Sequence, residues 1–248
     1  KPAGGNRELR LLRIMDRVVA KALQVAFAPF WTGVLPNLNQ DVCRLFAEMQ
    51  REITARGWYH LATDDIQNFF PSIRVEDAIH VHREHLGGHG ELLWLVETVI
   101  RGHEGPDRLV GLDQGSPYSP LAAELTLHHI LGLPTTERGP GHPLSFRYVD
   151  NVNYLASSAH EGQRALDDTQ RLLEPHGLTL KDEDGDPIDL RDRQHGRVVL
   201  GLIPVWEGDH LGFLLPESAY VRLGECLETV WREPDPIRSA RRVMEGWF

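Results

Sequence analysis

The stretch "RYVDNVNYLA", residues 147–156, decides the fold, because it sets one carboxylate between two apolar segments. With its neighbours, "LSFRYVDNVNYLAS" (144–157) predicts two strands around a tight turn, since Asp and Asn tolerate turn geometry. Asp150 lies in that turn, with the uncharged Asn151 beside it. Two interpretations are open here: Asp150 serves the turn alone, or it also holds a metal ion.

The composition is ordinary for a soluble globular protein with a substantial core: 248 residues, 41% hydrophobic and 25% charged. No apolar run approaches the ~18–20 residues that span a bilayer, and no signal peptide is visible, so we expect a cytoplasmic protein without a membrane partner. The distant Cys43 and Cys226 exclude a disulfide framework and a cysteine-rich zinc site. Since the chain begins with Lys1, we expect a fragment or the ordered part of a longer protein.

The net charge of -10 argues mildly against nucleic-acid binding, because such proteins usually present a basic face. The charge is uneven, however. Residues 1–60 hold nine Lys and Arg against five Asp and Glu, which leaves +4. Six of the 36 acidic residues lie in "DEDGDPIDLRD" (182–192), which is typical of a solvated loop. A global charge of this kind does not exclude a local basic groove.

Periodicity and capping residues predict the secondary structure. Helices are expected at 16–31 with Asp16 as its cap, 41–53, 75–86, 91–102, 121–131 and 158–177 with a Ser158–Glu161 capping box. Strands are expected at 58–66, 196–205 and 210–216, with a strand or hairpin arm at 7–14. This order predicts an α+β domain whose helices pack on one face of an antiparallel sheet.

Three segments could carry chemistry together: "TDDIQNFFPSI" (63–73), "GLDQGSPYSPLAAEL" (111–125) and "YVDN" (148–151). Alone, each is more often a turn, a cap or a plain loop. Two carboxylates on adjacent strand ends, however, can bind divalent ions through oxygen. Two such ions about 4 Å apart activate an attacking hydroxyl and stabilise a leaving pyrophosphate. That is the chemistry of nucleotide addition.

The same segments resemble the motifs of bacterial reverse transcriptases. "DIQNFFPSI" (65–73) resembles motif A, "QGSPYSPLAAEL" (114–125) motif B, and "RYVDNVNYL" (147–155) motif C, usually Tyr-x-Asp-Asp. "RELRLLRIMDRVVAKAL" (7–23) resembles the fingers motif, while "HGLTLK" (176–181) and "VVLGLIP" (198–204) stand where motifs D and E belong. The resemblance covers roughly residues 5–215 and is nearest to the retron, group II intron and antiphage-defence branches.

The resemblance implies a right-handed polymerase with fingers at 1–57 and a palm with inserted fingers helices at 58–205. Residues 206–248 would hold the end of motif E and the start of a thumb or a C-terminal segment. It implies Asp65 and Asp150 as ligands of two Mg²⁺ ions, or Mn²⁺, with the Ile66 carbonyl as a further ligand and Asn151 as a third catalytic position. Asp64 is not assigned as a ligand, because the family pattern Asp-Ile-x-x-Phe-Phe aligns its Asp with Asp65. Neighbouring residues on a strand also face opposite sides of the sheet.

The resemblance also assigns the nucleotide site. Phe70 matches the steric gate that favours dNTP over NTP, and Gln114 matches the motif B glutamine beside the incoming nucleotide. Arg7 and Arg13 would clamp the triphosphate, Lys181 would protonate pyrophosphate, and Gly201 would touch the primer end. A core aromatic at Phe70 and a solvated strand face at Arg13 remain open alternatives.

Several positions depart from the family pattern: Leu12 and Asp113 replace Pro, and Asn151 replaces the second Asp. Asn keeps an oxygen donor and loses one charge, so we expect weaker metal binding and a greater dependence on metal concentration or on manganese. Only about 30 residues follow residue 215, where the resemblance ends, so the thumb is expected to be reduced, missing from this chain or supplied by a protein partner.

The expected function is RNA-directed DNA polymerase activity, adding dNTPs to a 3′-hydroxyl in bacterial antiphage defence or a retroelement-derived system. The partners would be an RNA template or a dedicated noncoding RNA, and the DNA product. Two alternatives stay open. One is a catalytically dead palm that binds nucleic acid or a partner, and the other is RNA synthesis from NTPs.

Overall fold

The computed structural model describes residues 12–31, 35, 41–132, 141–182 and 185–245. The chain divides into two compact units, Lys1–Pro187 and Ile188–Phe248. The expected boundaries of fingers and palm stay a prediction. Among the described residues, no helix has both the length and the apolar character that a membrane crossing needs.

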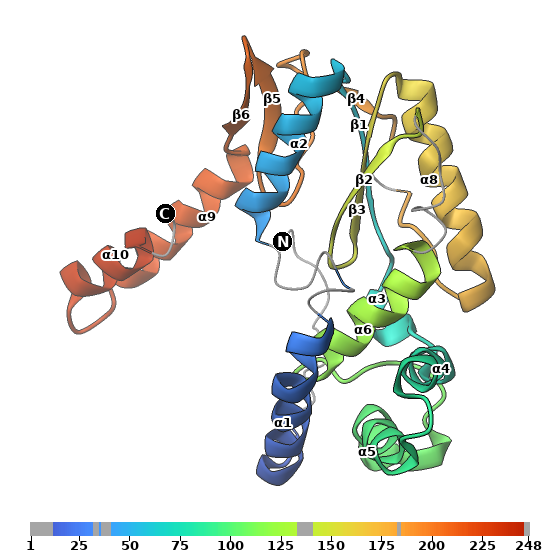
Figure 1. Cartoon of the computed structure of the whole chain (residues 1–248). Coiled ribbons are helices and arrows are strands. Elements are labelled where there is room, and N and C mark those ends of the chain that lie inside the picture. The colour runs from blue at the N-terminus through green and yellow to red at the C-terminus, as the bar shows by residue number, and fades with distance from the viewer. Residues whose placement is uncertain (1–11, 32–34, 36–40, 133–140, 183–184, 246–248) are drawn as a thin grey trace. The chain divides into compact units, whose positions relative to one another are not determined.

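The first unit is built on an antiparallel sheet with the strand order β2-β3-β1 (Figure 1). The strands are β1 His60–Asp65, β2 Leu144–Tyr148 and β3 Asn151–Ala156. β2 and β3 form the predicted hairpin, and β1 adds to the other side of β3 from 86 residues earlier in the chain. The predicted α+β class with an antiparallel sheet is therefore confirmed.

Helix α8, Ala159–Leu173, lies along the sheet and packs on β1 and β3 (Figure 1). Its N-terminus is the one predicted, since the Ser158 hydroxyl accepts the Glu161 N–H at 3.3 Å. The Glu161 carboxylate takes a hydrogen bond from the Ser157 hydroxyl, so the capping box is only half formed. Every residue of β3 is buried, which shows that both faces of this central strand are covered.

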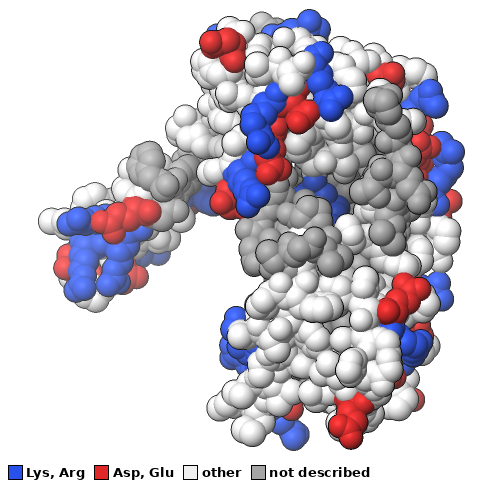
Figure 2. All heavy atoms as spheres, viewed as in Figure 1, with Lys and Arg blue, Asp and Glu red and all other residues white. Residues whose placement is uncertain are grey.

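Helix α2, Val42–Arg56, contacts the edge strand β2 and is capped by the Asp41 carboxylate, which accepts the Arg44 N–H at 2.6 Å. Acidic and basic side chains lie side by side in this part of the surface (Figure 2). Along α2, Arg44 pairs with Glu48 and Arg56 with Glu52, so this helix offers no uniform basic stripe to a nucleic acid.

Most of the remaining helices of the first unit contribute to a shared apolar core, in which α4 contacts α5 and α6, whereas the short η1 and η3 bury no residue and adjoin α5 and α8. The remaining helices are α1 Ile14–Trp31, α3 Phe69–Ser72, α4 Val75–Leu86, α5 Gly90–Arg101, η1 Gly102–Asp107, α6 Ser119–Leu127, the π-helical turn η2 His128–Gly132 and η3 Glu174–His176. The boundaries predicted for α4 are confirmed, because its apolar period and its Gly87 stop are local signals.

Two predictions near the N-terminus are wrong or lie outside the described residues. α1 begins at Ile14, so Asp16 lies inside its first turn and does not cap it. Of the strand expected at 7–14, residues 7–11 are outside the described part, 12 and 13 have no regular structure, and Ile14 is helical. An acidic residue is favourable both as an N-cap and within the first turn of a helix. Asp16 therefore indicated that a helix begins here but did not fix its first residue.

The second unit holds the two-residue strand β4 Ile188–Asp189, the hairpin of β5 Ile203–Glu207 and β6 His210–Leu214, and helices α9 Glu217–Val230 and α10 Pro236–Glu245. The strand predicted at 196–205 is wrong in its first part. There Val199 and Leu202 form an isolated bridge around Leu200 and Gly201, whose φ values are 51° and 88°. Two successive positive φ angles define a tight turn that interrupts the apolar run.

Candidate active site

The register of the sheet brings motif A and motif C together. Asp65 at the end of β1 lies opposite Asn151 at the start of β3. The Ile66 N–H donates to the Asp150 carbonyl at 2.9 Å. Asp65 and Asp150 therefore occupy neighbouring backbone positions at one end of the sheet, as the sequence motifs predict.

The turn that carries Asp150 is strained. Only Val149 and Asp150 separate the paired residues Tyr148 and Asn151, and Val149 has a φ of 55°. A β-branched residue rarely adopts a positive φ, and such outliers cluster at functional sites. Strain at this position is therefore a reason to expect a functional role for the turn that holds Asp150.

Both oxygens of the Asp65 carboxylate accept hydrogen bonds. The Lys181 ammonium donates to Oδ2 and the Asn151 amide to Oδ1, each at 2.8 Å. The backbone holds Lys181 there, because its N–H donates to the Asp65 carbonyl at 2.9 Å. Lys181, 116 residues away in the sequence, thus contacts the Asp65 carboxylate directly.

A chain of hydrogen bonds sets the direction of the Asn151 amide. The Asn153 amide, fully buried, donates to the Phe146 carbonyl at 2.9 Å and to the Asn151 Oδ1 at 2.6 Å. Because the carbonyl fixes Asn153, the oxygen of Asn151 faces Asn153 and its NH₂ group faces Asp65. The expected oxygen donor of Asn151 is therefore turned away, and the residue presents hydrogen-bond donors to Asp65.

Asp64, set aside as a ligand, proves to be a positioning residue. Its carboxylate accepts the Asp65 N–H at 2.7 Å and the Asp182 N–H at 3.0 Å. Burial raises the pKa of this carboxyl above its ordinary value, against the lowering effect of the two backbone hydrogen bonds. Asp64 thereby ties the end of β1 to the segment that carries Lys181. In the sequence, the only indication of this role is the position of Asp64 next to Asp65.

The motif B loop lies against motif A through backbone contacts. The Leu112 N–H donates to the Phe70 carbonyl at 2.9 Å, and the Phe70 ring packs edge-on to Phe69 with centroids 5.5 Å apart. Gln114 follows two residues later in a turn and is half-buried. Phe70 itself is partly buried against the core, so the ring has both an apolar side and an accessible one.

The unusual Asp113 has a structural explanation. Its carboxylate pairs with the Arg108 guanidinium at 2.8 Å, and both side chains are buried. Its carbonyl also accepts the Ser116 N–H at 3.2 Å, which closes the turn around Gln114. This ion pair and this hydrogen bond restrict the loop where the family pattern has Pro. The partner Arg108 could not be identified from sequence spacing.

A second buried ion pair links motif B to motif C. Arg147 of β2 makes a two-pronged contact with Glu124 of α6, with Nη1 to Oε2 at 2.7 Å. The same Nη1 donates to the Val149 carbonyl at 3.2 Å in the strained turn. Arg147 therefore stabilises the turn that contains Asp150. The sequence alone did not indicate this role.

The other predicted site residues are placed as follows. Arg7 lies outside the described residues. Arg13 is exposed and directly precedes α1, where its carbonyl accepts the Arg17 N–H at 3.0 Å, so it does not lie on a strand. Gly201 lies in the tight turn of the second unit, exposed, and a side chain there would meet open space.

The donor set at the end of the sheet suits Mg²⁺. Two aspartate carboxylates and a main-chain carbonyl are the hard oxygen ligands that this ion prefers. Asp65 is accessible, with 36% of its side chain exposed. Each carboxylate oxygen has two lone pairs, so the hydrogen bonds from Lys181 and Asn151 leave lone pairs of Asp65 for a metal ion.

Residues 1–183 match the profile of the family described as reverse transcriptase (RNA-dependent DNA polymerase). The chain therefore belongs to the reverse transcriptase family. A search among curated proteins found no match.

Two solved telomerase structures are similar in fold. Apo telomerase from Candida tropicalis has a TM-score of 0.53 at 9% identity, over 76% of this chain and 38% of that one. Telomerase from Candida albicans in complex with a TWJ fragment of telomeric RNA has a TM-score of 0.55 at 10% identity, over 75% and 37%. The chain thus spans well under half the length of these proteins, and the likeness concerns the fold alone.

Proposed function

We propose that the protein is an RNA-directed DNA polymerase that adds dNTPs to a 3′-hydroxyl. The observation that carries this proposal is the β1–β3 register, which sets Asp65 and Asp150 side by side in the backbone. Lys181 lies on the same carboxylate, in a chain that belongs to the reverse transcriptase family. Three motif residues from distant parts of the sequence thereby converge at one end of one sheet.

Asp65, Asp150 and the Ile66 carbonyl would hold two Mg²⁺ ions, or Mn²⁺. When bound, such ions activate an attacking hydroxyl and stabilise a leaving pyrophosphate. The Lys181 ammonium, held at the Asp65 carboxylate, would be a proton donor for the leaving pyrophosphate.

The nucleotide is proposed to lie between motif A and the motif B loop. Phe70 would lie against C2′ of the sugar and exclude a 2′-hydroxyl. Gln114 would contact the nucleotide from the turn that the Arg108–Asp113 pair stabilises. Arg7 and Arg13 are proposed to bind the triphosphate, and Gly201 the primer end.

An RNA template or a dedicated noncoding RNA, with the DNA product, completes the proposal. A protein partner is also proposed. The setting in bacterial antiphage defence or a retroelement-derived system rests on the sequence resemblance.

Primer extension tests the proposal. The assay measures dNTP incorporation on an RNA template with a DNA primer, in Mg²⁺ and separately in Mn²⁺. Asp65→Asn and Asp150→Asn should each reduce the rate by about 100-fold or more. Asp167→Asn on the exposed face of α8 removes one carboxylate away from the site and should leave the rate unchanged. Equal synthesis by native protein and Asp65→Asn would contradict the proposal.

One observation favours a second candidate, a palm that binds nucleic acid without catalysis. Both Asp65 oxygens are satisfied by protein donors, and Asn151 turns its amide hydrogens toward the carboxylate. This candidate expects RNA binding, measured by fluorescence anisotropy, but no incorporation in either metal. Incorporation that depends on Asp65 would exclude it.

A further inference from the structure

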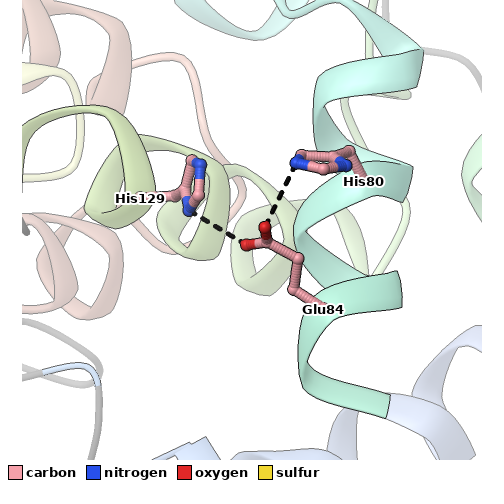
Figure 3. Close-up of side chains that lie close together, drawn as sticks. All are labelled: His80, Glu84 and His129. Carbon is pink, nitrogen blue, oxygen red and sulfur yellow. Dashed lines mark ion pairs between the residues drawn. The ribbon is translucent and has the colours of Figure 1, made fainter. Parts of the chain in front are cut away.

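A cluster of two histidines and one glutamate lies apart from the motif residues. His80 and Glu84 belong to α4, and His129 belongs to the π-helical turn η2 (Figure 3). Their nearest ligand atoms all lie within 4.8 Å of one another. The reverse transcriptase motifs include none of the three residues.

The geometry of the cluster approaches that of a metal site. The His80 Nε2 lies 3.3 Å from one Glu84 oxygen, and the His129 Nδ1 lies 3.5 Å from the other. Ligand atoms bound about 2.0–2.2 Å from a tetrahedral zinc ion are roughly 3.3–3.6 Å apart. Each histidine therefore already lies at this distance from one of the two Glu84 oxygens. Binding through a single Glu84 oxygen requires side-chain rotation, and the side chains of His80 and His129 are 56% and 28% exposed.

Rigid elements hold the ligands in place. His80 and Glu84 are one turn apart and therefore lie on the same side of α4. The other side of the helix is anchored in the core by Ala78, Ile79, His82 and Leu86. η2 is anchored in turn by Ile130 and Leu131. A site on two anchored elements needs little reorganisation when an ion binds.

The backbone at His129 is also unusual. The helix that begins at Ser119 changes from α to π geometry at His128. A π turn widens the helix and redirects the side chains that follow, and it appears frequently at functional sites. Here it accompanies the placement of the His129 ring toward Glu84, as Figure 3 shows.

We propose that His80, Glu84 and His129 form a binding site for a divalent transition-metal ion, best suited to Zn²⁺, with water as the fourth ligand. Two imidazoles and a carboxylate favour zinc and its neighbours over Mg²⁺, which prefers oxygen ligands. The site is therefore chemically distinct from the aspartates of the sheet. The bound ion cross-links α4 to the end of the helix that carries motif B, and so stiffens the support of the motif B loop.

Metal titration of the full chain tests this proposal. The protein is freed of any polyhistidine tag, treated with chelator and titrated with Zn²⁺ by calorimetry in excess Mg²⁺. We expect one high-affinity zinc ion per chain. Substituting Co²⁺ should give the intense visible absorption of a four-coordinate site. At zinc concentrations 100-fold above Kd, the Tm should rise by about 5 °C or more.

Variants at the three positions locate the site. His80→Ala and His129→Ala should each weaken zinc binding by more than ~100-fold, beyond the loss typical of an outer-shell partner. Glu84→Gln should weaken it, while Glu84→His, which supplies a third imidazole, should retain it. All three side chains are accessible, so the variants should keep the circular dichroism and Tm of the metal-free native protein.

Matched controls separate this site from others. His160→Ala removes an exposed histidine of α8 and should not change zinc binding. Asp65→Asn should not change it either, because that residue belongs to the sheet site. Native zinc affinity in His80→Ala and His129→Ala would overturn the proposal. So would weak binding of several zinc ions per native chain.

Discussion

Replacing Asn151 with Asp restores the usual motif C and puts the arrangement around Asp65 to the test. In the native protein the Asn151 amide donates to Asp65 Oδ1 at 2.8 Å. The variant loses a hydrogen bond to a charged group, which contributes about 1.5–3 kcal/mol. It also sets two carboxylates against each other. Without a divalent ion, Asn151→Asp should therefore destabilise the fold.

The size of the effect follows from the distance. Two unit charges 2.8 Å apart repel by ~6 kcal/mol at an effective dielectric constant of 20 and by ~1.5 kcal/mol in water. The Asp65 side chain is 36% exposed and Lys181 offsets part of the charge, so solvent screening and side-chain separation reduce the repulsion. We expect a loss of about 2–4 kcal/mol in the free energy of unfolding at pH 7.

Urea unfolding in EDTA and in Mg²⁺ measures this loss. Mg²⁺ should restore much of the stability of Asn151→Asp, because an ion bound to the folded state stabilises it by mass action. Asn151→Ala, which removes the amide without adding charge, is the matched control and should show a smaller loss with little Mg²⁺ dependence. In primer extension, native protein should need a higher Mg²⁺ concentration than Asn151→Asp.

Two outcomes would refute this reasoning. One is an Asn151→Asp variant as stable as native protein in EDTA, since that would mean the amide does not face Asp65. The other is identical Mg²⁺ titrations of polymerase activity, which would mean that residue 151 does not influence metal binding.

Three further predictions follow from other contacts. Burial lowers the pKa of His82 to about 4, so folding stability should fall as pH drops from 6.5 towards 4, by about 2 kcal/mol at pH 5; His82→Gln should lose this pH dependence in urea unfolding. Arg147→Met leaves Glu124 buried without its partner and should cost about 3–5 kcal/mol in unfolding free energy, with a smaller loss when Glu124→Leu is added. Phe70→Ala should raise the ratio of NTP to dNTP incorporation by about tenfold; an unchanged ratio would make Phe70 a core residue only.

Local signals in the sequence predicted much of the fold. α2 and α8 have a helical apolar period, and α8 also has the predicted Ser158 cap; such signals act within a few residues. The β2–β3 hairpin follows from its short polar turn for the same reason. Where the local pattern was ambiguous, as in the apolar run before Ile203, a tight turn at Leu200 and Gly201 replaced the expected strand.

The sequence by itself determined which residues belong to the motifs, but only the tertiary structure decided what they touch. Asn151 looked like a weakened ligand, and the buried Asn153 makes it a donor to Asp65. The contact between Lys181 and Asp65 joins residues 116 positions apart in the sequence. His129 meets Glu84 only because two helices pack together. Hydrogen bonds and ion pairs are set by distance in space, and residues far apart in the sequence carry no local pattern that reveals them.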